Sequence, residues 1–148
     1  LIKRNTNERG IVVNKFIGSK LGYNTTTLND LSSMLNLEPS VIKMDIEGFE
    51  VEAFEGGWEI IRKLRPQIFL EIHPKFINQR NPMAFNKLID ELFKLYNMEY
   101  ARNHWGQIKG EETFHNEWEK ATPDIIFKIA NEIISNDQKP YAFAIHCY

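Results

Sequence analysis

Apolar residues in the first half of the chain alternate between the spacing of strands and that of helices. Apolar runs predict strands over residues 10–18, 40–46 and 67–72. Leucines at helical spacing predict a short helix that begins after Thr27 as its N-cap. A second apolar stripe predicts a helix over residues 50–64, in which the pair Gly56 and Gly57 indicates close packing. Strand, helix and strand in this order predict a parallel βαβ unit with a right-handed crossover.

The second half of the chain continues the same alternation. It predicts two helices, each opened by a capping residue followed by proline: Asn81 with Pro82, and Thr122 with Pro123. A strand is predicted over residues 98–105, and the polar, acidic residues 106–120 are expected to form a surface excursion. Strict alternation over residues 141–148 predicts a final strand with one buried face.

Composition narrows the class of protein. With 148 residues, of which 43% are hydrophobic and 26% charged, the chain can bury the core of one α/β or α+β domain. Its net charge of -2 gives no general attraction for nucleic acid or for an anionic membrane surface, so neither partner is expected. No apolar run approaches the ~20 residues that span a bilayer, and the start lacks a secretory signal, so a cytoplasmic protein is expected. The single cysteine, Cys147, excludes an internal disulfide and a cysteine-based zinc cluster.

Titratable side chains follow two of the predicted strands. Asp45 comes near the end of the strand over 40–46, and Glu71 and His73 come at the end of the strand over 67–72. Because ligands bind beyond the carboxyl ends of the strands in an open parallel sheet, these side chains are expected on one rim. His73, with an unperturbed pKa near ~6.5, or a partly buried Asp45 is therefore a candidate general base for a substrate hydroxyl.

Other polar and aromatic residues have simpler explanations. Glu47 and Glu50 lie at the start of the predicted helix, where a carboxylate gains ~0.3–1 kcal/mol from the unpaired N–H groups, so neither needs a chemical role. Trp105 flanks the acidic excursion and could line an acceptor pocket, although ordinary packing explains it as well. The histidines other than His73 lack a paired i, i+4 spacing, so no metal site is expected from them.

Three segments in order resemble the C-terminal half of FkbM-family methyltransferases: "TTLNDL", "VIKMDIEGFEVEAFEGG" and "RPQIFLEIHP". The resemblance is close over residues 11–74 and continues beyond them in the order of elements. It implies an α/β, Rossmann-like class I methyltransferase fold, with a mostly parallel sheet and a C-terminal antiparallel strand. It also implies S-adenosyl-L-methionine as methyl donor and O-methylation of a hydroxyl on a sugar, polyketide or similar small molecule. A homodimer is compatible with it.

The resemblance matches particular positions with roles. Asp45 matches the acidic end of the family's fourth strand, beside the cofactor and the acceptor, and Glu47 and Gly48 match the turn after it. Glu71 and His73 match the end of the fifth strand. Removal of a proton is expected of Asp45 or His73. The expected assignments are cofactor binding by Asp45, Ile46 and Glu47, and acceptor binding by Glu71, His73 and Trp105.

The front of the chain departs from the family pattern. A class I fold needs an early strand followed by a glycine-rich turn, which lets the backbone approach the cofactor closely. The eight glycines of this chain contain no G-x-G pattern, and no predicted strand precedes Gly10. We therefore expect residues 1–148 to form a single methyltransferase-like domain that either lacks its first βα units, including the glycine-rich cofactor turn, or is a degenerate member of the family. In both cases it should bind the donor weakly by itself.

Two other classes of function stay open at this point. Asp45, Glu47 and Glu71 carry the carboxylate oxygens that Mg²⁺ prefers, as in a metal-dependent phosphohydrolase or nuclease. Asp45 and Glu47 would point to opposite sides if the strand continued through them, which counts against shared ligation. The other class is a binding or assembly module without catalysis.

Overall fold

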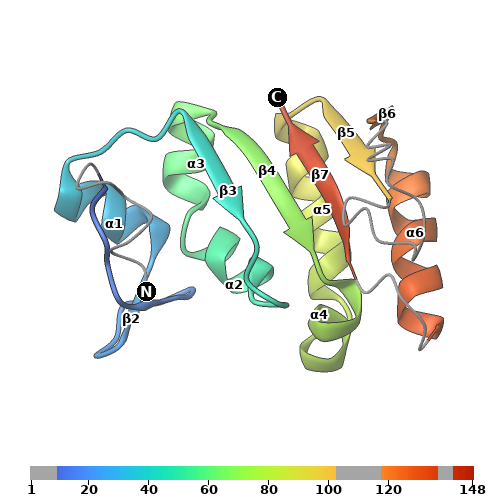
Figure 1. The fold of residues 1–148 in the computed structure, drawn as a ribbon, viewed down its shortest axis with the longest axis horizontal. Coiled ribbons are helices and arrows are strands. Elements are labelled where there is room, and N and C mark those ends of the chain that lie inside the picture. Colours follow the sequence, from blue (N-terminus) through green and yellow to red (C-terminus); the bar gives the residue numbers. More distant parts are fainter. Residues whose placement is uncertain (1–9, 103–117, 137–141) are drawn as a thin grey trace, which may run out of the picture.

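The computed structural model describes residues 10–102, 118–136 and 142–148. Figure 1 shows strands and helices alternating along the chain. In chain order the elements are β1 (Phe16–Ile17), β2 (Thr25–Thr26), α1 (Leu28–Leu35), β3 (Val41–Met44), α2 (Glu50–Glu55), α3 (Trp58–Leu64), β4 (Gln67–Ile72), α4 (Pro74–Arg80), α5 (Ala84–Leu95), β5 (Met98–Ala101), β6 (Glu119–Lys120), α6 (Pro123–Ser135) and β7 (Phe143–Cys147).

The main sheet has the strand order β3-β4-β7-β5-β6. β3 and β4 pair in parallel, whereas β7 pairs antiparallel with both β4 and β5, and β6 pairs antiparallel with β5. The expected C-terminal antiparallel strand is thus confirmed. The expectation of a mostly parallel sheet is wrong for the pairing, because β7 enters between β4 and β5 and makes both of its contacts antiparallel. β5 nevertheless runs in the same direction as β3 and β4.

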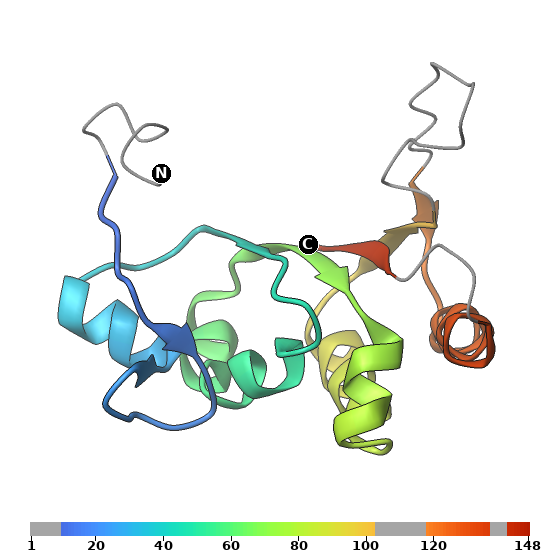
Figure 2. The same ribbon diagram turned by 60° about the horizontal axis from the view of Figure 1, so that its bottom comes forward.

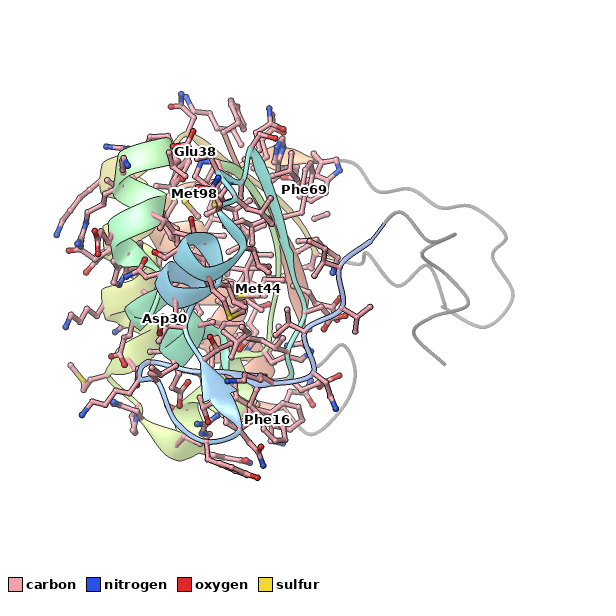
Figure 3. The ribbon with its side chains drawn as sticks, turned by 90° about the vertical axis from the view of Figure 1, so that its left-hand side faces the viewer. Phe16, Asp30, Glu38, Met44, Phe69 and Met98 are labelled. Carbon is pink, nitrogen blue, oxygen red and sulfur yellow. The ribbon has the colours of Figure 1, made fainter. Side chains whose placement is uncertain are left out.

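The helices that follow β3 cover one side of the main sheet. Figure 2 shows α2, α3, α4 and α5 together on that side. In Figure 3, Met44 lies toward these helices and Phe69 on the other side of the sheet. The core between sheet and helices contains fully or almost fully buried side chains from both layers, among them Phe54, Ile61, Ile72, Leu92 and Phe143. Each side chain of this size contributes roughly 1.5–3 kcal/mol by leaving water, so this layer contact holds β3 and β4 in place.

Strong local signals in the sequence are confirmed by the structure. The strand over 67–72 forms as predicted, and it is central because β3 and β7 flank it. Thr27 caps α1, since its side chain accepts a hydrogen bond from the backbone N–H of Asp30 at 3.0 Å. Thr122 likewise caps α6 through the N–H of Ile125. β7 alternates as predicted, with its odd-numbered side chains buried.

The N-terminal strand and the long helix are shorter than predicted. The strand over 10–18 is reduced to β1, which pairs in parallel with β2 outside the main sheet. The helix over 50–64 is interrupted at Gly56 and Gly57, which separate α2 from α3. A Cβ on Gly56 would lie 2.3 Å from the carbonyl oxygen of Gly18. The glycine pair therefore marks close packing, as the sequence indicated.

The predicted start of the helix at Asn81 and Pro82 is wrong. Asn81 instead ends α4, a helix that the hydrophobic pattern did not predict, and α5 begins at Ala84. The strand over 98–105 ends at Ala101. Within the expected excursion over 106–120, residues Glu119–Lys120 form β6, and the excursion otherwise falls largely outside the described residues.

In the part of the chain that the structure describes, no helix combines the length and the apolar character needed to cross a membrane.

Candidate functional site

The carboxyl ends of β3 and β4 form the candidate site. Because the two strands are parallel and pair Met44 with Leu70, both end at the same edge of the sheet, near the start of α2 and α4 (Figure 1). Asp45 follows Met44, while Glu71 and His73 follow Leu70. The structure brings these three predicted residues together, since one side-chain atom from each lies within 4.8 Å of the other two.

The three side chains differ in their exposure to solvent. His73 and Glu71 are buried, and Glu71 Oε1 lies 3.6 Å from His73 Nε2. The side chain of Asp45 is 37% exposed, with Lys43 Nζ 3.9 Å from its Oδ2. The site therefore combines a buried imidazole and a buried carboxylate with a carboxylate that faces solvent.

Glu50 is a member of this site that the sequence analysis did not identify. Its side chain is fully buried in the first turn of α2, and its Oε1 lies 2.9 Å from His73 Nδ1. The backbone N–H of Gly48 donates to the same Oε1 at 3.0 Å. One signal was available: Glu50 precedes Ala53 and Phe54 by three and four residues, so it lies on the helix face that carries the buried stripe.

The turn between β3 and α2 determines where the acidic side chains point. Glu47 and Gly48 both adopt left-handed backbone conformations, with φ values of 53° and 93°. β3 has already ended at Met44, so the strand alternation that would separate Asp45 from Glu47 does not apply. Glu47 Oε2 instead lies 3.4 Å from His73 Nε2, and the side chain of Glu47 is 70% exposed.

Arg80, the last residue of α4, holds this turn from outside. Its Nη1 donates to the carbonyl oxygen of Gly48 at 3.1 Å, and its guanidinium lies 3.7 Å from the ring centroid of Phe49. It also forms an ion pair with Glu52 of α2. α4 is thus tied to the start of α2 by contacts that span the turn, which restricts the position of Glu47.

Electrostatics in the site favour the charged form of His73. Burial alone lowers the pKa of an imidazole, but here the hydrogen bond from His73 to Glu50 and the charges of Glu50, Glu47 and Glu71 outweigh it. The pKa of His73 is therefore raised above its ordinary value of 6.5. The imidazole keeps its proton to a higher pH than a free histidine would.

The arrangement can transfer a proton and can attract a cation. Carboxylates lie close to both ring nitrogens of His73, so the imidazole can exchange a proton with a group bound beside these carboxylates. Among the described residues, the donors that converge closely enough to share a metal ion come from Asp45, Glu71 and His73. The Mg²⁺ set suggested by the sequence had Glu47 in place of His73. Since Mg²⁺ prefers oxygen donors, the imidazole fits that interpretation less well.

Two of the remaining predicted residues lie differently. Ile46, which lies between Asp45 and Glu47 in the sequence, is partly buried and packs against the hydrophobic core. Trp105 falls outside the described residues.

A comparison with models of known protein families gives a match over most of the chain. The methyltransferase FkbM domain matches residues 9–104, which include the turn after β3, the end of β4 and all of α4. No curated protein and no solved structure matches the chain significantly.

Proposed function

The chain belongs to the FkbM methyltransferase family, and from this premise we propose that it catalyses S-adenosyl-L-methionine-dependent O-methylation of a hydroxyl on a sugar, polyketide or similar small molecule. The family implies a methyltransferase that uses this donor. The observation that supports a reaction at this site is the convergence of Asp45, Glu71 and His73 at the rim of the sheet, within the matched residues.

The rim has the right chemistry for the donor. S-adenosyl-L-methionine carries a sulfonium, an ammonium and hydroxyl groups, and when bound it supplies an electrophilic methyl group. Asp45 and Glu47 present partly or largely exposed carboxylates that attract positive charge and accept hydrogen bonds. Ile46 packs against the core and fixes the backbone between them. These three residues would hold the donor.

The end of β4 would serve the acceptor. Glu71 and His73 can accept or donate hydrogen bonds to a hydroxyl, and their burial keeps water away from the reacting oxygen. Trp105 is proposed as a further contact to the acceptor. Holding the acceptor oxygen in line with the methyl group supplies much of the rate. Removal of the hydroxyl proton by Asp45 or His73 contributes roughly a further 10²–10⁴-fold.

We also propose that the family's glycine-rich cofactor turn lies outside residues 1–148, since this sequence contains no G-x-G pattern. The proposed domain would then hold the donor firmly only when that turn is present. Donor affinity is therefore best compared between residues 1–148 and the longest natural form of the protein.

The test combines titration calorimetry with a transfer assay. S-adenosyl-L-methionine and Mg²⁺ are titrated separately into each form of the protein. Methyl-labelled donor is then incubated with a panel of monosaccharide and polyketide alcohols, and formation of S-adenosylhomocysteine is followed. Donor binding and label transfer are expected in the longest form. Mg²⁺ binding with phosphoester hydrolysis and no donor binding would favour the hydrolase, and binding of neither would favour a module without catalysis.

A further inference from the structure

Glu50 is an unusual residue to find in a protein core. Its side chain has no exposure to solvent, and a buried carboxylate is costly unless it is paired and hydrogen-bonded. Oε1 has two partners, Gly48 N–H and His73 Nδ1. Among the described residues, Oε2 has none. An apolar side chain of similar size would avoid this cost, so the contact with His73 is the feature that needs an explanation.

The contact fixes which ring nitrogen of His73 carries a proton. A carboxylate accepts and does not donate, so Glu50 requires a hydrogen on Nδ1 whether the ring is neutral or charged. The neutral ring then has its lone pair on Nε2. That atom lies on the side of the ring that faces Glu47 at 3.4 Å and Glu71 at 3.6 Å. The ring of Phe76 lies nearly parallel to the imidazole, at 15° and 5.9 Å between centroids, and restricts its rotation.

We propose that Glu50 is a positioning residue that holds His73 in the Nδ1–H form, so that Nε2 is the atom that removes the proton from the acceptor hydroxyl. This inference rests on the proposed function. As the acceptor oxygen forms its bond to the methyl carbon, its proton passes to the lone pair of Nε2. The electron pair of the broken C–S bond stays on sulfur, which becomes a neutral thioether. His73 ends the step as an imidazolium between Glu50 and the rim.

Four carboxylates lie near His73 and stabilise that imidazolium. Glu50 faces it from α2, Glu47 from the turn, Glu71 from the end of β4 and Asp45 from the end of β3. Two cations lie near this cluster: Arg80 is engaged by the carbonyl oxygen of Gly48, by Glu52 and by the ring of Phe49, and Lys43 Nζ lies 3.9 Å from Oδ2 of Asp45. A carboxylate that orients an imidazole and stabilises its charged form is the arrangement that makes histidine an effective base.

The test reads His73 directly by ¹⁵N-detected NMR with chelator present, in the full chain and without donor or acceptor. Spectra recorded over a pH series give both the tautomer of the neutral ring and the pKa. In the unmodified chain we expect the Nδ1–H tautomer and a pKa above 6.5. Glu50→Gln should lower that pKa and mix the tautomers. Glu55→Gln is the matched control, since Glu55 is an exposed glutamate on the same helix, and it should leave both unchanged.

Two outcomes would overturn the proposal. One is an Nε2–H tautomer in the unmodified chain, a measurement that does not depend on whether any variant folds. The other is a folded Glu50→Gln variant in which His73 keeps its tautomer and its pKa.

A transfer assay in the longest natural form separates this inference from the proposed function. With the donor and the alcohol panel, Glu50→Gln should lower kcat by roughly 10- to 100-fold and shift the pH profile to lower pH, with little change in KM. If the NMR result holds and no form of the protein transfers a methyl group, the proposed function fails while the positioning of His73 by Glu50 stands. If transfer occurs and its pH profile is the same in Glu50→Gln, the inference fails alone.

Discussion

Replacing Gly48 by alanine tests whether the turn after β3 requires a residue without a side chain. Gly48 has a φ of 93°, and an L residue forced into left-handed backbone loses about 1–2 kcal/mol. The added Cβ would also lie 2.4 Å from the Cβ of Phe76, and overpacking of this kind costs about 1–3 kcal/mol. The sum, about 2–5 kcal/mol, is a large part of the roughly 5–15 kcal/mol by which domains are stable.

The assay is urea unfolding followed by circular dichroism, with Gly22→Ala as the matched control. A Cβ on Gly22 would meet its nearest neighbour, Thr25 Cβ, at an ordinary 3.6 Å, and Gly22 is not among the glycines with positive φ. Gly22→Ala should therefore change the free energy of unfolding by no more than about 0.5 kcal/mol. Equal effects of the two substitutions would refute the reasoning.

A double-mutant cycle separates the two contributions at Gly48. Phe76→Gly, made alone and in the Gly48→Ala background, removes the Cβ of residue 76 that the added side chain would meet. The contact part of the loss should then be relieved, while the backbone part stays. We expect a coupling energy of about 0.5–3 kcal/mol between the two substitutions. Additive losses would mean that Phe76 is not what restricts residue 48.

Three further predictions concern the site and the core. Asp45→Asn should leave the free energy of unfolding within about 0.5 kcal/mol of the unmodified chain, because its side chain is 37% exposed. In the longest natural form it should still reduce methyl transfer by roughly 10²-fold, because Asp45 is proposed to position the donor, and near-normal formation of S-adenosylhomocysteine would contradict that role. Burial raises the pKa of the Cys147 thiol to about 12, so a thiol-specific chromogenic reagent should react at neutral pH only after urea is added, and rapid reaction of the folded chain would contradict its burial. The folded-state pKa of His73 lies above 6.5, so the extra stability of the unmodified chain over His73→Gln, measured by urea unfolding, should be fully present below pH 6.5 and lost as pH rises through the raised pKa. A difference in urea midpoint that does not change with pH would count against the charged Glu50–His73 pair.

Elements with strong local signals were predictable from the sequence. The strand over 67–72 is a near-continuous apolar run, interrupted by Glu71, and its last three residues are all buried in the interior of the sheet. Thr27 and Thr122 cap helices through contacts with residues three positions away, which a sequence reveals directly. Each of these features depends on neighbours along the chain, so no tertiary information was needed.

The helix α4 could not be found from the hydrophobic pattern. Only Pro74 and Ile77 of its residues are buried, so it lacks an apolar stripe. Asn81 followed by Pro82 has the sequence typical of a helix start, but Asn81 is the C-cap of α4. The prediction of a strand over 10–18 was wrong for most of its length, although the apolar pattern was there. Its apolar residues are present, but Ile11 and Phe16 are largely exposed because no strand of the main sheet lies beside them.

The candidate site was predictable as a place but not as a set of contacts. Parallel pairing of β3 and β4 was enough to bring Asp45 and His73 to one edge. The role of Glu50 depended on a left-handed turn, and the helix dipole offered a sufficient explanation for an acidic residue in the first turn of α2. Burial decides between the two explanations: a glutamate that only interacts with the dipole has no reason to lose all contact with solvent.

The segment between β3 and α2 depends on Gly48 for its contacts. The N–H of Gly48 donates to Glu50, and its carbonyl oxygen accepts from Arg80. Its α-carbon faces Phe76, whose ring also stacks on the ring of His73. A side chain at this position would therefore disturb the partner of His73 and its neighbouring ring at once. It follows that Gly48→Ala should change the NMR tautomer of His73 as well as stability, whereas Gly22→Ala should change neither. A Gly48→Ala chain that is destabilised but keeps the Nδ1–H tautomer would show that Glu50 orients His73 without help from the turn.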